Sequence, residues 1–472
     1  MSGLKVLLRF DTEDYITVES NQAVSDILDI LDQLSIRATF VLVGEKIKLI
    51  NNNPDIIDKL QKHALGYHSY RHSYHPLANE YLINKGWNQG IDEFMEKEED
   101  GYHLFVNTFQ KNPICFTQPG ADWIPHAYPA LQQWQIPFFF SENKHSLINI
   151  EEEPFFINEI LSFAKEVTIS DLTSLSNKGL WEDAKTKFDK GYQQAISKGD
   201  KFIVIACHPG RMITTGQPWD IYNFGGGQNK AHQEWLKAPL KDKIDYQQDL
   251  MAFKEFLIHL KENYNIDWIT AEEFLRLHEK ANSNQQIDKG TIQELAQKFT
   301  AEISFYQAND YWLSPIQAGI VLARFILTNV DEGYYPAAVK APGPVYFPDK
   351  INDQKIDPAL DRIGWTELVT GAKYLIDRFN KYNSFPLKIK VSPNLWINTE
   401  QLIGGLAQAI VSMTVDNIPQ DRILLPGTYL KTRDYVKKID QIQWDWPIFE
   451  KGFQNQEIVD YTKLLSWTLR PS

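Results

Sequence analysis

Two histidines, His68 and His72, stand four residues apart, after a predicted buried strand at residues 38–44. On a helical turn, residues i and i+4 lie on one face, so both imidazoles can bind the same metal ion. Neutral imidazole suits zinc and neighbouring divalent metals. Because a metal needs further ligands, the pair predicts a metal site only where other donor groups come close to it.

Three carboxylates, Asp11, Glu13 and Asp14, follow the apolar segment at residues 4–10, where a predicted strand gives way to a loop. Loop side chains at the carboxyl ends of strands in an α/β sheet converge on the ligand crevice. The cluster therefore offers candidates for a general base and a metal ligand. A solvated turn that caps the following helix is an equally good interpretation of the cluster alone.

A third histidine, His208, ends the apolar segment at residues 201–207 and precedes Pro209-Gly210. This placement predicts a histidine at the carboxyl end of another strand, the edge where the metal motif is also expected. An imidazole donates a proton near its own pKa, which suits a general acid. The alternative is a structural histidine that caps a strand end.

The elements that must position these residues alternate along the chain. Residues 4–10 and 36–43 are predicted strands, and residues 18–34 and 53–62 are predicted helices, which indicates an α/β fold with a mostly parallel sheet. The alternation extends to about residue 280, and the polar segment 281–290 is predicted to be a linker. Residues 291–472 are predicted to form a mostly helical domain, with helices at residues 314–329, 366–380 and 399–414.

Composition narrows the class of protein. The chain has 472 residues, of which 43% are hydrophobic, so two globular domains are expected. Its formal net charge of −13 disfavours nucleic acid and anionic lipid as partners. No run of eighteen apolar residues predicts a membrane span, and the N-terminus enters a short strand rather than a secretory signal, which favours a cytoplasmic protein. Two cysteines are too few for a disulfide framework or a thiolate metal site.

The order of these motifs resembles the polysaccharide deacetylases, carbohydrate esterase family four, over about residues 1–280. The matching segments are Leu8-Arg9-Phe10-Asp11-Thr12-Glu13-Asp14, Arg37-Ala38-Thr39-Phe40 and Gly66-Tyr67-His68-Ser69-Tyr70-Arg71-His72. The resemblance implies the NodB-homology fold, a deformed (β/α) barrel, with a divalent metal, zinc foremost. It implies that Asp11 is the general base, His208 the general acid, and His68 and His72 metal ligands. The third ligand is Asp14, which keeps the usual residue type, or Glu13, which alternation places on the side of Asp11; we favour Asp14.

The chain also departs from the family pattern. Gln118 stands where the family has an arginine that orients the catalytic aspartate, and Arg71 or Arg211 is a candidate replacement. The family's tryptophan motif is not identifiable, and Trp181 is only a candidate for it. Despite these departures, the resemblance implies metal-dependent removal of N-acetyl groups from a glycan as the expected function. The alternatives are a small-amide hydrolase of the same superfamily and a non-catalytic carbohydrate-binding protein.

The predicted helical domain faintly resembles the pseudomurein-binding repeat and similar wall-associated modules, because each helix is followed by a short segment with a proline. An ordinary helical domain is the more economical interpretation. Aromatic residues in it are candidate sugar-stacking platforms, although most aromatic residues in such numbers belong to cores. The candidates are Tyr311, Trp312, Trp396, Trp444 and Trp446.

Overall fold

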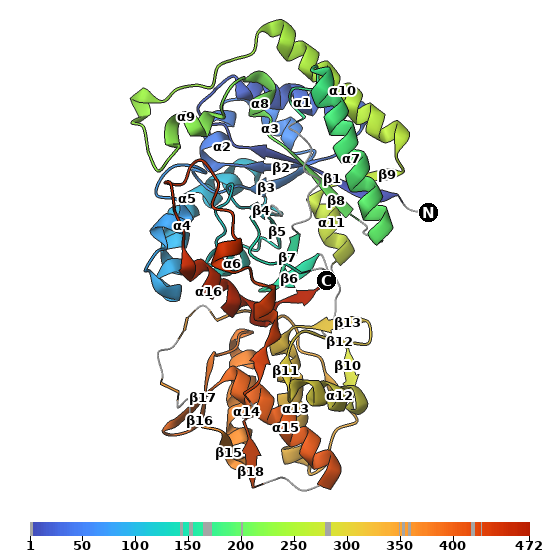
Figure 1. Cartoon of the computed structure of the whole chain (residues 1–472), viewed down its shortest axis with the longest axis vertical. Helices are drawn as coiled ribbons and strands as arrows, with labels where there is room; N and C mark the ends of the chain where they lie inside the picture. Colours follow the sequence, from blue (N-terminus) through green and yellow to red (C-terminus); the bar gives the residue numbers. More distant parts are fainter. Residues whose placement is uncertain are drawn as a thin grey trace.

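A computed structural model shows an N-terminal α/β part and a largely helical C-terminal part stacked along the long axis of the molecule (Figure 1). The residues that the structure describes are 3–141, 145–150, 154–163, 172–199, 202–278, 285–348, 350–351, 355–356, 360–416, 421–425 and 427–472. Within these ranges, no helix is both long enough and apolar enough to cross a membrane.

The N-terminal part is built on one curled sheet, which has ten strands among the described residues. Near one end of the sheet, β1 (Leu4–Thr12) pairs in parallel with β2 (Thr39–Leu42), β8 (Phe202–Cys207) and β9 (Ile266–Ile269). Beyond β2 the strands run β3 (Ala64–Tyr67), β4 (Phe116–Thr117), β5 (Phe138–Phe140), β7 (Ile160–Phe163), β6 (Phe155–Ile157) and β20 (Arg470–Pro471). All neighbouring pairs are parallel except β6 with β7 and β20 with β6. The predicted deformed barrel of the NodB type is confirmed.

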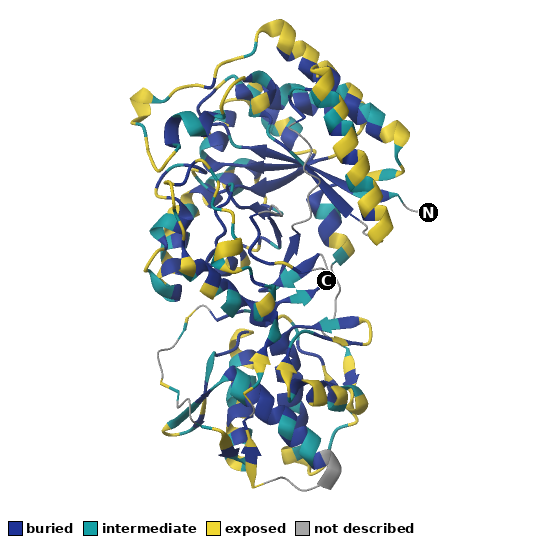
Figure 2. Cartoon of the chain, viewed as in Figure 1, coloured by how far each residue is buried: buried dark blue, intermediate teal, exposed yellow. Residues whose placement is uncertain are grey.

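Helices cover this sheet because each carries one apolar stripe, and the strands beneath them are buried on both faces (Figure 2). In α1 the buried positions Val24, Ile27, Leu28 and Leu31 follow the helical period and confirm the predicted helix. The helices of this part are α1 (Ser20–Leu34), α2 (Gly44–Ile50), α3 (Pro54–Leu60), α4 (Ala78–Tyr81), α5 (Gly86–Phe109), α6 (Ala127–Gln133), α7 (Lys178–Lys198), α8 (Gly210–Ile213), α9 (Trp219–Phe224), α10 (Lys243–Asn263) and α11 (Ala271–His278).

The C-terminal part contains two copies of one unit, strand, helix, hairpin, helix, strand. The first copy runs β10 (Gln286–Asp288), α12 (Lys289–Phe299), β12 (Tyr306–Ala308), β13 (Tyr311–Leu313), α13 (Pro315–Glu332) and β14 (Ala338–Lys340), with the short strand β11 (Glu302–Ile303) before its hairpin. The second runs β15 (Arg362–Gly364), α14 (Trp365–Tyr382), β16 (Lys388–Ser392), β17 (Leu395–Asn398), α15 (Thr399–Asp416) and β18 (Arg422–Leu424). In each copy the outer strands pair with each other and the hairpin strands pair with each other, all antiparallel.

The duplication has a signature in the sequence. Trp312-Leu313-Ser314-Pro315-Ile316-Gln317 and Trp396-Ile397-Asn398-Thr399-Glu400-Gln401 both read tryptophan, aliphatic residue, cap, two residues, glutamine. In both copies the cap residue and the glutamine exchange hydrogen bonds between side chain and backbone. The three helices predicted in this part are therefore α13, α14 and α15, and the helix α12 completes the pairs.

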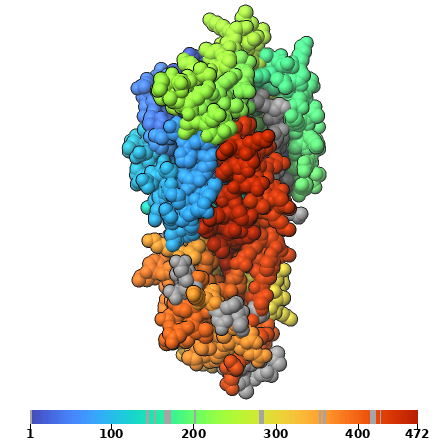
Figure 3. Space-filling view, turned by 60° about the vertical axis from the view of Figure 1, so that its left-hand side comes forward, coloured from blue at the N-terminus to red at the C-terminus, as the bar shows by residue number. Residues whose placement is uncertain are grey.

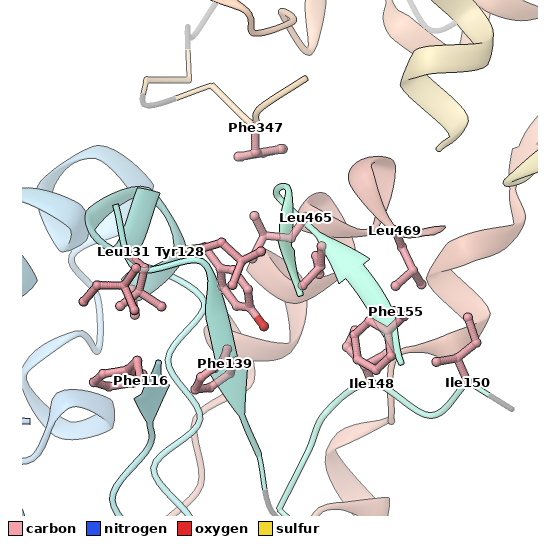
Figure 4. Close-up of a cluster of buried hydrophobic side chains, with 14 of the residues drawn as sticks. Phe116, Tyr128, Leu131, Phe139, Ile148, Ile150, Phe155, Phe347, Leu465 and Leu469 are labelled. Atoms are coloured by element: carbon pink, nitrogen blue, oxygen red, sulfur yellow. The ribbon is translucent and has the colours of Figure 1, made fainter. Parts of the chain in front are cut away.

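The end of the chain returns to the N-terminal part. After β19 (Tyr429–Leu430), which pairs with β11, the chain runs up the molecule to α16 (Gln456–Leu465) and to β20 at the edge of the main sheet. Figure 3 shows this end as a red band along the blue surface of the N-terminal part. In Figure 4, Leu465 and Leu469 belong to one cluster of buried side chains, with Leu469 on the side of Phe155, and the two leucines are fully buried. The proposed division at residues 1–280, 281–290 and 291–472 stays a prediction, and β10 begins within the predicted linker.

Candidate active site and metal centre

Glu13, His68 and His72 come together at the carboxyl edge of the sheet. The Oε2 atom of Glu13 lies 2.9 Å from Nε2 of His72 and 3.5 Å from Nε2 of His68. One donor atom from each of the three residues lies within 4.8 Å of the donor atoms of the other two. Among the described residues, this is the group of histidine, cysteine or acidic side chains close enough together to hold a metal ion. Two imidazoles and one carboxylate with open positions are a donor set that fits zinc or a similar divalent cation.

A loop turn, and not a helical turn, brings the two histidines together. Residues 68–72 are not helical, and Ser69 and His72 have φ angles of 63° and 53°. The Ser69 hydroxyl accepts a hydrogen bond of 3.0 Å from the backbone N–H of His72 and holds the turn. The predicted helical turn is therefore wrong, because two left-handed residues reverse the chain and bring the imidazole centroids within 4.9 Å.

The second nitrogen of each imidazole is held by a partner that fixes its orientation. Nδ1 of His68 lies 2.8 Å from the carbonyl oxygen of Thr117, so it carries the hydrogen and leaves the lone pair on Nε2. Nδ1 of His72 lies 2.6 Å from the Ser73 hydroxyl, which in turn donates to Asp220 at 3.0 Å. Such partners orient metal-binding imidazoles and fix their tautomer. Both Nε2 atoms therefore face Glu13 in the form that binds a cation.

The charge on Glu13 is stabilised by its neighbours. Burial raises the pKa of the Glu13 carboxyl, but its interactions with His72 and His208 and its hydrogen bonds to His68 and His72 outweigh burial and hold the pKa well below its usual range. Burial in the same way raises the pKa of Asp220. Glu13 is therefore the ionised acceptor of this group.

Asp14, the favoured third ligand, is not part of this group. Its Oδ1 atom accepts hydrogen bonds from the backbone N–H groups of Ile16 and Thr17, at 3.0 and 2.8 Å. Burial raises the pKa of Asp14 to about 6, and the positive charge of Lys46 opposes the rise. Asp14 organises the loop that enters α1, and alternation at the end of β1 puts Glu13 on the side of Asp11. The third ligand stays a prediction, and this arrangement favours Glu13 over Asp14.

Asp11 is held by an arginine that the motif comparison missed. Nε of Arg9 lies 2.9 Å from Oδ1 of Asp11, and Nη2 of Arg9 donates to Oδ2 at 3.0 Å. Both side chains are buried, and such a two-pronged pair fixes the position of a carboxylate. Arg9 stands two residues before Asp11 in β1, so strand alternation places both on one face.

The residues considered for this role do something else. The amide nitrogen of Gln118 donates to the carbonyl oxygen of Gly120 at 3.1 Å. Arg71 lies 3.6 Å from Glu45 and is half exposed, and Arg211 is exposed. The cation that orients Asp11 is therefore Arg9, which lies in the same strand as Asp11. Gln118, Arg71 and Arg211 do not take this role.

His208 faces Asp11 across two neighbouring strands. The register of β1 and β8 pairs Phe10 with Cys207, so Asp11 in β1 lies beside His208, the first residue after β8. Nε2 of His208 lies 3.9 Å from Oδ2 of Asp11, and the imidazole is 27% exposed. The structure thus brings Asp11, His208, Glu13, His68 and His72 into one site, with a candidate base and a candidate acid beside the metal-binding group.

Two tryptophans form walls next to His72. The Trp219 ring lies 5.9 Å from the His72 ring, and Trp446, from the end of the chain, lies 5.7 Å from it at right angles. Trp181 instead packs on Phe256 between α7 and α10. A cavity of about 260 Å³ adjoins the site and is lined by His72 and Pro119 among others. No sequence pattern indicated that Trp219 or Asp220 belongs to the site, because only the fold brings residues near 220 to residues near 72.

Residues 2–123 match the family model described as polysaccharide deacetylase. The resemblance to this family that the sequence motifs indicated is therefore confirmed for the N-terminal part of the chain. No curated protein sequence matches the chain.

Several solved structures are similar to the same part of the chain. One is a carbohydrate esterase family four domain of a multidomain xylanase from the hindgut metagenome of Trinervitermes trinervoides, with 16% identity, a TM-score of 0.32, and coverage of 59% of this chain and 92% of that one. Another is a probable polysaccharide deacetylase from Pseudomonas aeruginosa, with 10% identity, a TM-score of 0.38, and coverage of 58% and 89%. A third is a pseudoenzyme of the same esterase family from Bacillus anthracis, with 14% identity, a TM-score of 0.30, and coverage of 57% and 64%.

Proposed function

We propose that the protein is a metal-dependent deacetylase that hydrolyses N-acetyl groups on a sugar polymer or glycan precursor. The observation that carries the proposal is the position of Asp11 and His208, 3.9 Å apart, next to the group of Glu13, His68 and His72. A base, an acid and a cation site that converge on one sheet edge are what hydrolysis of an amide requires. A divalent cation, zinc foremost, bound by the three ligands would polarise the acetyl carbonyl and the attacking water.

The chain's own groups supply the proton transfers. Asp11, held by one hydrogen bond and one ion-pair contact from Arg9, accepts the proton of the attacking water. His208, on the neighbouring strand and open to solvent, donates a proton to the leaving amine of the sugar. The hydrolysis breaks the C–N bond and yields acetate and a free amine.

Arg9 also bears on the alternatives. The absence of the family's arginine and tryptophan motifs suggested a non-catalytic carbohydrate-binding protein. Since Arg9 supplies the cation from β1, the absence of the arginine motif no longer speaks against catalysis. The small-amide hydrolase would use the same site with a different pocket, so the choice of substrate separates it from a deacetylase.

The test is acetate release from N-acetylated hexosamine oligosaccharides by purified full-length protein with added zinc. Asp11→Asn and His208→Ala should each lower the rate by at least about 100-fold, the usual contribution of a general base or acid, and leave the circular dichroism spectrum unchanged. His103→Ala, an exposed histidine on α5, is the matched control and should keep the wild-type rate. Wild-type turnover in both site variants would contradict the proposal, and turnover of small amides alone would replace the substrate class.

A further inference from the structure

The last part of the chain reaches the mouth of the site. We call residues 436–453 the returning segment, which connects the C-terminal part to α16. The backbone carbonyl oxygens of Pro447 and Ile448 accept hydrogen bonds from the N–H groups of Gly226 and Gly227, both at 2.9 Å. The segment is thereby fixed to the loop that follows α9, which itself carries Trp219.

Trp446 lies at the point where this segment meets the metal ligands. Its ring stands at 90° to the His72 ring, with 5.7 Å between the centroids. A Cβ atom at Gly120 would lie 2.4 Å from Cε2 of Trp446, and Gly120 has a φ of 42°. The indole therefore rests directly on the turn at Gly120, where the backbone has no side chain to displace it.

The surroundings of Trp446 are those of a binding wall and not only of a core. One side of its ring packs against Phe449, 5.5 Å away, but the side chain as a whole is only half buried. The neighbouring Asp445 is 60% exposed and lies 3.6 Å from His145. A half-buried indole beside a metal-binding imidazole is suited to a ring that has an apolar face and hydroxyl groups at its edge.

We propose that Trp446 is the stacking wall of a sugar-binding subsite beside the metal group, and that the returning segment makes the site specific for a pyranose ring. This inference rests on the proposed function and adds to it the residue that selects a sugar over a small amide. The C-terminal part then has a direct role in substrate binding, because it delivers Trp446 to a site whose reacting groups all come from the first 210 residues. Trp446 is a specificity residue and takes no part in proton transfer.

The experiment compares Trp446→Ala, Trp446→Phe and the wild type on two substrates. The first substrate is an N-acetylglucosamine oligomer, and the second is N-methylacetamide, an acetyl amide without any ring. For the oligomer we expect Trp446→Ala to raise KM about tenfold with little change in kcat, and Trp446→Phe to restore most of the affinity. For N-methylacetamide we expect all three proteins to have the same kcat/KM, and the bound zinc to be unchanged.

The matched control is Trp396→Ala. Trp396 is a half-buried tryptophan in the hairpin strand β17 that packs on Tyr374 of α14, away from the site. The control variant should keep the wild-type KM for the oligomer. A wild-type KM in Trp446→Ala, or an equal loss on both substrates, would overturn the inference and leave the proposed function intact. If the wild type releases no acetate from the oligomer, the proposed function itself fails, and oligomer binding measured by calorimetry then decides on the subsite: loss of binding in Trp446→Ala alone upholds it, and equal binding in all variants overturns it.

Discussion

The pair of Arg9 and Asp11 offers the sharpest test of how the site is held. Both side chains are almost fully buried, with exposed fractions of 1% and 4%, and two short contacts join them. Removing one partner of such a pair leaves an uncompensated buried charge, which typically costs about 3–5 kcal/mol. We therefore expect Arg9→Met to lower the free energy of unfolding by about 4 kcal/mol, measured by urea denaturation.

The same change should impair catalysis, because a base that is no longer oriented loses part of its effect. We expect kcat/KM for acetate release to fall by about 100-fold in Arg9→Met, and by less in Arg9→Lys, which keeps a charge but not the two-pronged geometry. The double variant Arg9→Met with Asp11→Asn should regain part of the lost stability, because the neutral amide needs no cation.

A surface ion pair of the same residue types provides the control. Arg37 lies 2.5 Å from Glu273, with side chains that are 55% and 35% exposed. Exposed pairs contribute at most about 1 kcal/mol, so Arg37→Met should have a small effect on stability and none on turnover. Equal effects of Arg9→Met and Arg37→Met, or strict additivity of Arg9→Met and Asp11→Asn, would refute the reasoning.

Three further predictions concern the ligands, the response to acid and the end of the chain. Glu13→Gln should lose bound zinc in elemental analysis while Asp14→Asn keeps it, and the reverse result would restore Asp14 as the ligand. Burial lowers the pKa of His63 to about 4, so the stability that the neutral imidazole contributes is full above about pH 6.5 and is lost as the pH falls toward 4. Between pH 7 and pH 5 the free energy of unfolding of the wild type should therefore fall by about 2 kcal/mol more than that of His63→Gln. Parallel pH profiles of unfolding for the two proteins would contradict this. Leu465→Ala should cost about 3 kcal/mol against less than about 0.5 kcal/mol for the exposed Leu277→Ala, and equal thermal midpoints would show that the chain end is not part of the core.

Much of the fold was predictable because its signals are local. Apolar runs such as residues 4–10 and the 3.6-residue stripe of α1 record burial directly in the sequence. The return of the chain end was not predictable, because β20 has two residues and its pairing with β6 spans more than 300 positions. The duplication in the C-terminal part was not predicted, because the loops between corresponding elements differ in length in the two copies.

In the site, too, some residues were predictable from the sequence and others were not. Motif order indicated Asp11, His68, His72 and His208, since each lies near the carboxyl end of a strand of one parallel sheet. The choice between Glu13 and Asp14 depended on where the loop after β1 turns, which the hydrogen bonds to Ile16 and Thr17 decide and the sequence does not state. Arg9 could have been found by strand alternation alone, whereas Trp446 could not, because no local pattern relates it to His72.

The most direct measurement is acetate release from an N-acetylglucosamine oligomer by the full-length protein, before and after removal of its metal with a chelator and reloading with zinc. The account predicts stoichiometric metal in the active protein, loss of acetate release on stripping, and recovery on reloading. Acetate release that survives stripping, or a fully metal-loaded protein that releases no acetate from any acetylated glycan, would contradict it.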